Sequence, residues 1–158
     1  RASTARVVVA DIAPVAYGHD QRQHIRAMRA LPLEDLSTRA EADRRLALTP
    51  PDRALRAFLL QSLDLRAEGG PRWRLNLDAL EAAMPLILGW PDLAGRFAGP
   101  VLFLTGKESG YVRPEHRPAI AALFPAARFA AIPGAGHWLH ADRPRAFEAA
   151  VETFLTLP

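Results

Sequence analysis

Apolar and polar positions divide the chain into two ends with β/α character and a middle with helical character. Residues 5–12 contain an unbroken β-branched run, which is typical of a strand buried on both faces of a parallel sheet. Two further apolar runs, 101–106 and 127–132, are bounded by glycine or proline and predict two more strands. The pattern predicts an α/β fold in which the first strand needs neighbours supplied from elsewhere.

The middle, residues 18–98, carries helix start and stop signals. Thr38-Arg-Ala-Glu41 fits a capping box, and Thr49-Pro50-Pro51-Asp52 combines a threonine cap with proline in the first turn. Gly69-Gly70-Pro71 stops the helix that this second signal starts. One face of that helix is expected to carry four apolar side chains at helical spacing. These are Leu55, Phe58, Leu59 and Leu63.

The remaining elements follow from the same kinds of pattern. Residues 73–77 alternate and are predicted to be extended, and residues 77–88 predict a helix that Pro85 interrupts. Residues 117–124 predict a short helix after the second strand. Asp142 is expected to cap the final helix, and its role would therefore be structural. The apolar face of this helix would consist of Phe147, Val151, Phe154 and Leu155.

Composition excludes several classes of protein. A length of 158 residues suits one domain, and the absence of cysteine excludes disulfides, cysteine-ligated metals and a thiol nucleophile. No apolar run approaches the ~18 residues that a membrane span requires. The 20 basic residues are interleaved with 17 acidic ones, so nucleic-acid binding is not expected. Residues 1–5 do not read as a signal peptide, and we expect a cytoplasmic protein.

Candidate chemistry lies after the predicted strands, because open parallel sheets bind ligands at the carboxyl ends of their strands. His137 follows the third strand on the glycine-rich turn Gly134-Ala-Gly-His. An imidazole held there can serve as a general base, or it can simply bond a carbonyl. His140 could pair with His137 on a metal, but no third ligand has suitable spacing, so we expect no metal and no cofactor.

Several stretches resemble a known family. Residues 131–144, with Gly-Ala-Gly-His137, resemble the catalytic-histidine segment of α/β-hydrolases. Asp11-Ile-Ala-Pro-Val15 and Trp73-Arg-Leu-Asn-Leu77 resemble a narrower branch, the small esterases of the YbfF type and their mitochondrial relatives. Residues 56–60 and 110–112 agree with it, so the resemblance covers nearly the whole chain.

The resemblance implies an α/β-hydrolase fold of which this chain holds the C-terminal strands. Residues 1–17 and 99–158 would form the hydrolase core, and residues 18–98 would be a helical cap inserted into it. The three strands would be the sixth, seventh and eighth of the family's sheet. His137 would be the base of a catalytic triad.

The acid of the triad is open between two residues. In most of the superfamily it follows the seventh strand as Gly-x-x-Asp, but here the stretch is Gly106-Lys-Glu108-Ser109. Ser109 stands in the place of the acid and cannot supply a charge, whereas Glu108 is one residue early. Some α/β-hydrolases carry the acid after the sixth strand, where Asp11 stands. We favour Asp11, with Glu108 as the alternative.

The nucleophile of the family is absent from this chain. Its signature is Gly-x-Ser-x-Gly on a strand-to-helix turn, and none of the four serines fits it. These are Ser3, Ser37, Ser62 and Ser109. The resemblance therefore implies a missing N-terminal half of the same enzyme, which would carry the serine and the oxyanion hole. The chain alone is expected to be inactive.

The function that follows is cleavage of carboxylic esters or thioesters by a Ser-His-Asp triad whose serine lies upstream. Two alternatives remain. Haloalkane dehalogenases and epoxide hydrolases keep the fold and use an upstream aspartate as nucleophile, and a non-catalytic binding module would need no nucleophile. Aromatic side chains are candidates to line a substrate pocket. They are Tyr17, Trp90, Tyr111 and Trp138, with His19 as a weaker candidate.

Overall fold

The computed structural model describes residues 4–18 and 21–156, so Ser3 and His19 lie outside the described residues. The chain separates into two compact units. The sheet unit consists of residues 1–16 and 90–158, and the helical unit consists of residues 17–89. Each unit is built around its own hydrophobic core.

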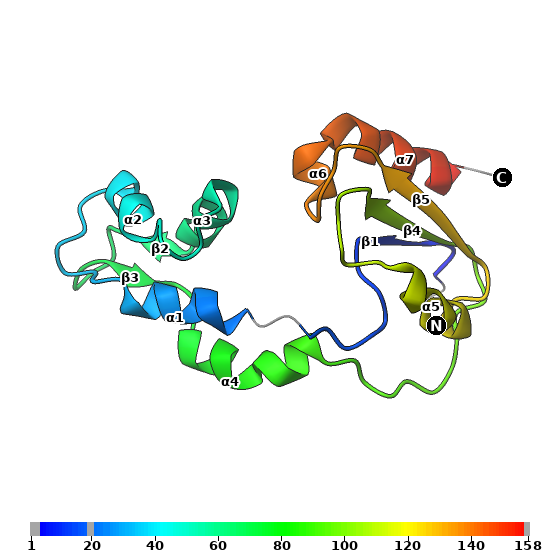
Figure 1. Ribbon diagram of the computed structural model, residues 1–158, viewed down its shortest axis with the longest axis horizontal. Helices are drawn as coiled ribbons and strands as arrows, with labels where there is room; N and C mark the ends of the chain where they lie inside the picture. The colour runs from blue at the N-terminus through cyan, green and yellow to red at the C-terminus, as the bar shows by residue number, and fades with distance from the viewer. Residues whose placement is uncertain (1–3, 19–20, 157–158) are drawn as a thin grey trace. The chain divides into compact units, whose positions relative to one another are not determined.

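In the part of the sheet unit that the structure describes, three parallel strands lie in the order β1-β4-β5 (Figure 1). These are β1 (Val7–Ala10), β4 (Val101–Gly106) and β5 (Ala127–Ile132). Val7 pairs with Val101, and Val101 pairs with Ala127, so the three strands start in register. The ranges predicted for β4 and β5 are confirmed, because buried runs between glycine and proline leave few alternatives.

The first strand differs from its prediction. It is shorter than residues 5–12, and its valines are half-buried instead of fully buried. The reason is its position: among the described residues β1 pairs with β4 alone and forms one edge of the sheet. An edge strand leaves one row of backbone groups without a partner strand.

Helices cover both faces of this sheet (Figure 1). They are η1 (Pro114–His116), α5 (Arg117–Leu123), α6 (Leu139–Asp142) and α7 (Pro144–Thr156). Because strand side chains alternate between faces, Val101 and Phe103 pack with Ile120 of α5. Leu102 and Leu104 pack on the other face with α6 and α7. β4, between two strands and two helical layers, is therefore the buried centre of the unit.

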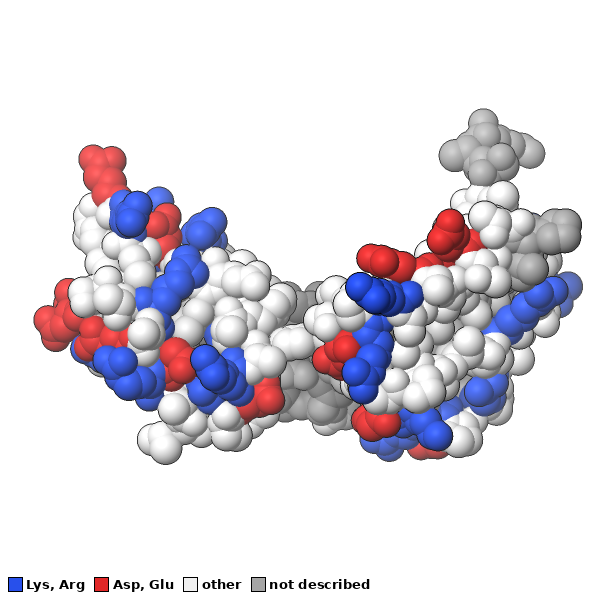
Figure 2. Space-filling view, turned by 90° about the horizontal axis from the view of Figure 1, so that it is seen from above, with Lys and Arg blue, Asp and Glu red and all other residues white. Residues whose placement is uncertain are grey.

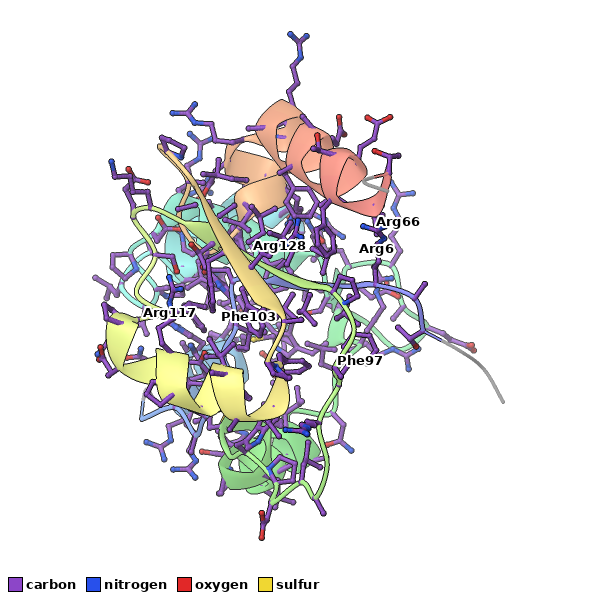
Figure 3. The ribbon with its side chains drawn as sticks, turned by 90° about the vertical axis from the view of Figure 1, so that its right-hand side faces the viewer. Arg6, Arg66, Phe97, Phe103, Arg117 and Arg128 are labelled. Atoms are coloured by element: carbon purple, nitrogen blue, oxygen red, sulfur yellow. The ribbon has the colours of Figure 1, made fainter. Side chains whose placement is uncertain are left out.

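Aromatic stacking and arginine–aromatic contacts lie at the edges of this core (Figure 3). Phe103 of β4 stacks on Phe129 of β5 with a centroid distance of 5.5 Å. The guanidinium of Arg117 lies 3.4 Å from the centroid of the Phe129 ring, on the side of α5. Arg6 reaches α7 and donates to the carbonyl of Phe154 at 3.0 Å. These arginines use their charge and their apolar stems to cover ring surface that would otherwise face water.

The described residues of the helical unit form four helices and a two-stranded antiparallel ribbon (Figure 1). The helices are α1 (Arg22–Ala30), α2 (Arg39–Arg45), α3 (Arg53–Leu60) and α4 (Leu77–Leu88), and the ribbon joins β2 (Leu63–Asp64) to β3 (Arg72–Trp73). Only the start of the extended stretch predicted at 73–77 is a strand. α4 runs through Pro85 without the predicted interruption. Trp73 donates its indole N–H to the carbonyl of Met28 at 2.9 Å and ties the ribbon to α1.

Side-chain caps start three of these helices. Thr38 accepts the N–H of Glu41 as predicted, and Asn76 accepts the N–H of Ala79 at the start of α4. The cap of α3 is Asp52, which accepts from the N–H of Leu55, so the predicted cap at Thr49 is wrong. Asp52 directly precedes α3, so its carboxylate, and not the hydroxyl of Thr49, reaches the free N–H groups of the first turn.

The apolar face predicted for α3 is also wrong. The helix ends at Leu60, and Leu63 is buried as part of β2. Phe58 is 55% exposed, whereas Leu60 and Arg56 are the buried side chains of the helix. Arg56 is satisfied by Asp43, at 2.8 Å from its Nε, and by the carbonyls of Pro50 and Pro51. A guanidinium with this many acceptors can be buried where a pattern of apolar positions would not place it.

The final helix begins one residue later than predicted. α6 ends at Asp142 and α7 starts at Pro144, so Asp142 does not cap α7. Its carboxylate instead accepts a hydrogen bond from the N–H of Gly136.

Basic and acidic side chains are interspersed on the surface seen in Figure 2. None of the helices formed by the described residues has both the length and the apolar character of a membrane span.

The bond to Arg56 lowers the pKa of the Asp43 carboxyl below its ordinary value of 3.8. The unfolded chain then binds more protons than the folded chain near this pH, so the pair contributes stability above pH 3.8 and loses it as pH falls. We expect Asp43→Asn to lower the free energy of unfolding of the protein at pH 7, with the difference from wild type shrinking below about pH 4. Urea denaturation at several pH values measures this. Asp35→Asn, on an exposed carboxylate, is the control, and a pH-independent difference would contradict the assignment.

Candidate active site

Asp11 follows β1 at the carboxyl edge of the sheet. Its backbone has a positive φ of 50°, which is uncommon for a residue with a side chain and is tolerated best by aspartate and asparagine. This turn, fixed by the Asp11 N–H donating to the carbonyl of Leu104 at 2.9 Å, buries the side chain completely. The N–H of Gly106 donates to Asp11 Oδ1 at 3.1 Å. The end of β4 thus binds one oxygen of the carboxylate.

His137 lies on the loop after β5, where a positive φ of 70° at Gly134 turns the chain back toward Asp11. Nδ1 of His137 lies 2.9 Å from Asp11 Oδ2. The side chain of His137 is 40% exposed, whereas that of Asp11 is fully buried. A carboxylate can only accept, so Nδ1 carries the proton of this bond and Nε2 is left as the acceptor nitrogen.

Ser109 is a site residue that the sequence reasoning set aside. Its hydroxyl donates to Asp11 Oδ2, the same oxygen that faces His137, and accepts the N–H of Tyr111 at 3.2 Å. With Gly106 and His137, it gives the buried carboxylate three donors. The signal was present in the sequence: Ser109 stands where the family usually places the acid, three residues after Gly106.

The ring of Tyr111 stacks on the imidazole of His137, with the ring centroids 3.8 Å apart and the planes 12° from parallel. The stack restricts rotation of the imidazole and shields one of its faces. Trp138 is half-buried and directly precedes α6, and Trp90 is 42% exposed in the segment after α4. Tyr17 belongs to the helical unit, where its N–H donates to the carbonyl of Leu88. A pocket lined by Tyr17, Trp90, Tyr111 and Trp138 stays a prediction.

Glu108, the alternative acid, has a different partner. Its Oε1 accepts the N–H of Gly134 at 3.2 Å, and its own N–H donates to the carbonyl of Ala135 at 3.1 Å. Asp142 accepts the N–H of Gly136 at 2.8 Å. Both carboxylates therefore bind the backbone of the loop, and Asp11 is the one that binds the ring of His137.

The absence of a side chain at Gly106 brings the two loops together. A Cβ placed on Gly106 would lie 2.1 Å from the carbonyl oxygen of Gly136 and 2.4 Å from that of Ala135. Real Cβ atoms do not approach oxygen this closely, so only glycine permits the contact. Among the described residues, no three His, Cys, Asp or Glu side chains are arranged to hold a metal ion.

A buried carboxylate, an imidazole on a glycine turn and parallel strands leading to both are features of one fold family. Residues 20–144 match the family described as the alpha/beta hydrolase fold. The chain belongs to this family. In an α/β-hydrolase, a histidine after the last strands and a carboxylate on its distal nitrogen are the expected positions of a triad's base and acid.

Curated relatives of this α/β-hydrolase include a mouse protein named sn-1-specific diacylglycerol lipase ABHD11, which is 38% identical over 156 residues. Esterase YbfF of Escherichia coli is 34% identical over 151 residues. Each comparison covers 95% of this chain, but 50% and 57% of the respective relative. The chain therefore spans about half the length of the curated relatives that it matches.

Solved structures agree on the fold. A marine microorganism esterase superposes on 94% of this α/β-hydrolase chain with a TM-score of 0.87 and 32% identity, and the match covers 60% of that esterase. E-2-(acetamidomethylene)succinate hydrolase superposes on 97% of the chain with a TM-score of 0.60. Its identity is 20%, so this second likeness supports the fold alone.

The close approach at Gly106 makes a direct prediction. Gly106→Ala should push the loop of His137 outward, break the Asp11–His137 bond and cost about 1–3 kcal/mol of stability through overpacking. Loss of the downfield Nδ1–H resonance of His137 in ¹H NMR measures the first effect, and chemical denaturation measures the second. Gly110→Ala is the matched control, because its Cβ would meet its nearest atom at 3.9 Å. A native resonance in the Gly106 variant would contradict the geometry.

Proposed function

We propose that the protein is a serine hydrolase that cleaves carboxylic ester or thioester bonds, with His137 as base and Asp11 as the acid of its triad. The observation that carries the proposal is the 2.9 Å contact between Asp11 Oδ2 and His137 Nδ1. It leaves Nε2 of a partly exposed imidazole free to take a proton, while a buried carboxylate holds the ring and stabilises its cation. The relatives named above, which are esterases and a lipase, support the same class.

The proposed reaction begins when the hydroxyl of an upstream serine attacks the carbonyl carbon of the substrate and its proton passes to Nε2 of His137. The tetrahedral intermediate collapses to an acyl-serine, and the leaving alcohol or thiol takes the proton from His137. A water molecule then attacks the acyl group as His137 accepts one of its protons. The carboxylic acid leaves, the proton returns to the serine, and no metal or cofactor enters the cycle.

Ser109 has a positioning role in this proposal. Its hydroxyl is one of the three donors on the Asp11 carboxylate, and it shares Oδ2 with the histidine. Removing it would leave a buried charge with two donors, which weakens the hold on the ring without removing any group that touches the substrate.

The nucleophile and the oxyanion hole are proposed to lie in an N-terminal half of the same enzyme. Three observations support this. No serine of the chain has the Gly-x-Ser-x-Gly setting, and the chain spans about half of its curated relatives. In addition, β1 pairs on one side only among the described residues, so its outer edge is free to take another strand. The helical unit, residues 17–89, is proposed to be the cap inserted into the core.

Labelling by a fluorophosphonate probe tests the acid assignment on the full-length protein. We expect Asp11→Asn to slow labelling by roughly 10³–10⁴-fold, because an acid turned amide favours the wrong tautomer of His137. Glu108→Gln keeps an acceptor for the Gly134 N–H and should slow labelling by no more than a few-fold. The reverse order would assign the acid to Glu108. If the wild-type protein is not labelled and hydrolyses alkyl halides or epoxides, the upstream nucleophile is an aspartate and not a serine.

The two-part architecture has its own test. The 158-residue chain alone should neither react with the probe nor hydrolyse a p-nitrophenyl ester, because its histidine has no hydroxyl to activate. Coexpression with the segment encoded upstream should restore both activities, and His137→Ala in the restored protein should abolish them. Labelling of a serine within the isolated chain would contradict the proposal.

A further inference from the structure

The loop that carries His137 is fixed to its surroundings at each residue. On one side, Glu108 accepts the Gly134 N–H and donates its own N–H to the carbonyl of Ala135. On the other side, the junction of α6 and α7 contacts the loop. Asp142 Oδ2 accepts the N–H of Gly136 at 2.8 Å, and Arg143 Nε donates to the carbonyl of Pro133 at 3.4 Å.

We propose that Asp142 is a positioning residue of the active site, which sets the place of the catalytic base by holding the N–H of the residue before it. This inference rests on the proposed function, since it assigns the group that holds His137 in that reaction. The hydrogen bond of Asp142 is made to the backbone of the loop and not to the ring of His137 or to Asp11. Asp142 acts through the backbone of Gly136, one peptide unit from His137.

Two features make this contact important. Glycine gives the loop freedom at Gly134 and Gly136, so the position of the imidazole is determined by contacts and not by the intrinsic preference of the backbone. In addition, a bond from a backbone N–H to a carboxylate is charge-assisted and about twice as strong as a bond to a neutral acceptor. Asp142 is the side chain that supplies such a bond directly before His137.

The use of Asp142 also explains the break between the last two helices. Its side chain would be the natural cap of α7, but α6 ends at Asp142 and α7 begins at Pro144. The carboxylate is directed at the loop instead. Arg143 lies over Gly134, whose added Cβ would be 2.3 Å from its Nη2, so neighbouring residues of one junction contact both ends of the turn.

The test compares variants of the full-length protein. Asp142→Asn keeps an oxygen that can accept the Gly136 N–H, and Asp142→Ala removes it. Glu148→Ala, which removes an exposed carboxylate of α7 from a position further along the chain, is the matched control. Ester hydrolysis gives kcat and KM, ¹H NMR gives the Nδ1–H resonance of His137, and urea denaturation gives the free energy of unfolding and so shows whether each variant is folded.

Asp142→Ala should lower kcat by about 10- to 30-fold with KM changed less than twofold, and should shift or broaden the Nδ1–H resonance. Asp142→Asn should restore kcat to within about threefold of wild type, and the control should match wild type. If Asp142→Ala does not fold, Asp142→Ser gives the same comparison, because its hydroxyl is too short to reach the loop. A native kcat and resonance in the folded Ala or Ser variant would overturn the proposal.

The variant Asp11→Asn separates this inference from the proposed function. If Asp11→Asn leaves activity unchanged, the triad itself is wrong, whatever Asp142 does. If Asp11→Asn abolishes activity and Asp142→Ala does not alter it, the triad stands and only the positioning role of Asp142 is lost. If Asp142→Asn loses as much kcat as Asp142→Ala, the role is also overturned, because asparagine keeps an acceptor for the Gly136 N–H and should recover part of the bond.

Discussion

The carboxyl end of the sheet depends on one buried carboxylate. Asp11 has no exposed side-chain surface, and an ionised group in that position costs several kcal/mol unless donors surround it. The donors come from segments distant in sequence: the end of β4 supplies Gly106 and Ser109, and the loop after β5 supplies His137. Satisfying one charge therefore fixes three loops relative to each other, and this is the geometry that a base and its orienting acid require.

The parts of the fold that depend on burial alone could be predicted from the sequence. β4 and β5 have the predicted bounds, and His137 could be placed after β5 because a glycine-rich turn follows a buried strand. β1 has the predicted place, but its half-burial could not be read from its valines. Exposure of a strand depends on how many neighbours it has, which is a property of the sheet and not of the strand's own residues.

The errors have a common cause, which is competition between partners for one polar group. Thr49 fits a helix cap in the sequence, but Asp52 is nearer to the free N–H groups of α3. Asp142 fits a cap as well, yet its carboxylate bonds the loop before His137. Ser109 was set aside because it lacks a charge, although its hydroxyl is a donor to the charge that Asp11 supplies. Sequence identifies the groups able to bond, and only tertiary contacts decide which bonds form.

The carboxylate of Asp11 after β1 has a consequence for the rest of the candidate site. The position three residues after Gly106, where the family's usual acid would stand, becomes free for a neutral donor, and Ser109 occupies it. The same hydroxyl accepts the N–H of Tyr111 and so holds the residue whose ring stacks on His137. An aspartate at that position would place a second negative charge beside Asp11, with a repulsion that a buried site screens poorly. The carboxylate of Asp11 and the hydroxyl of Ser109 therefore belong together as one arrangement, in which either residue changed alone leaves the other without its partner.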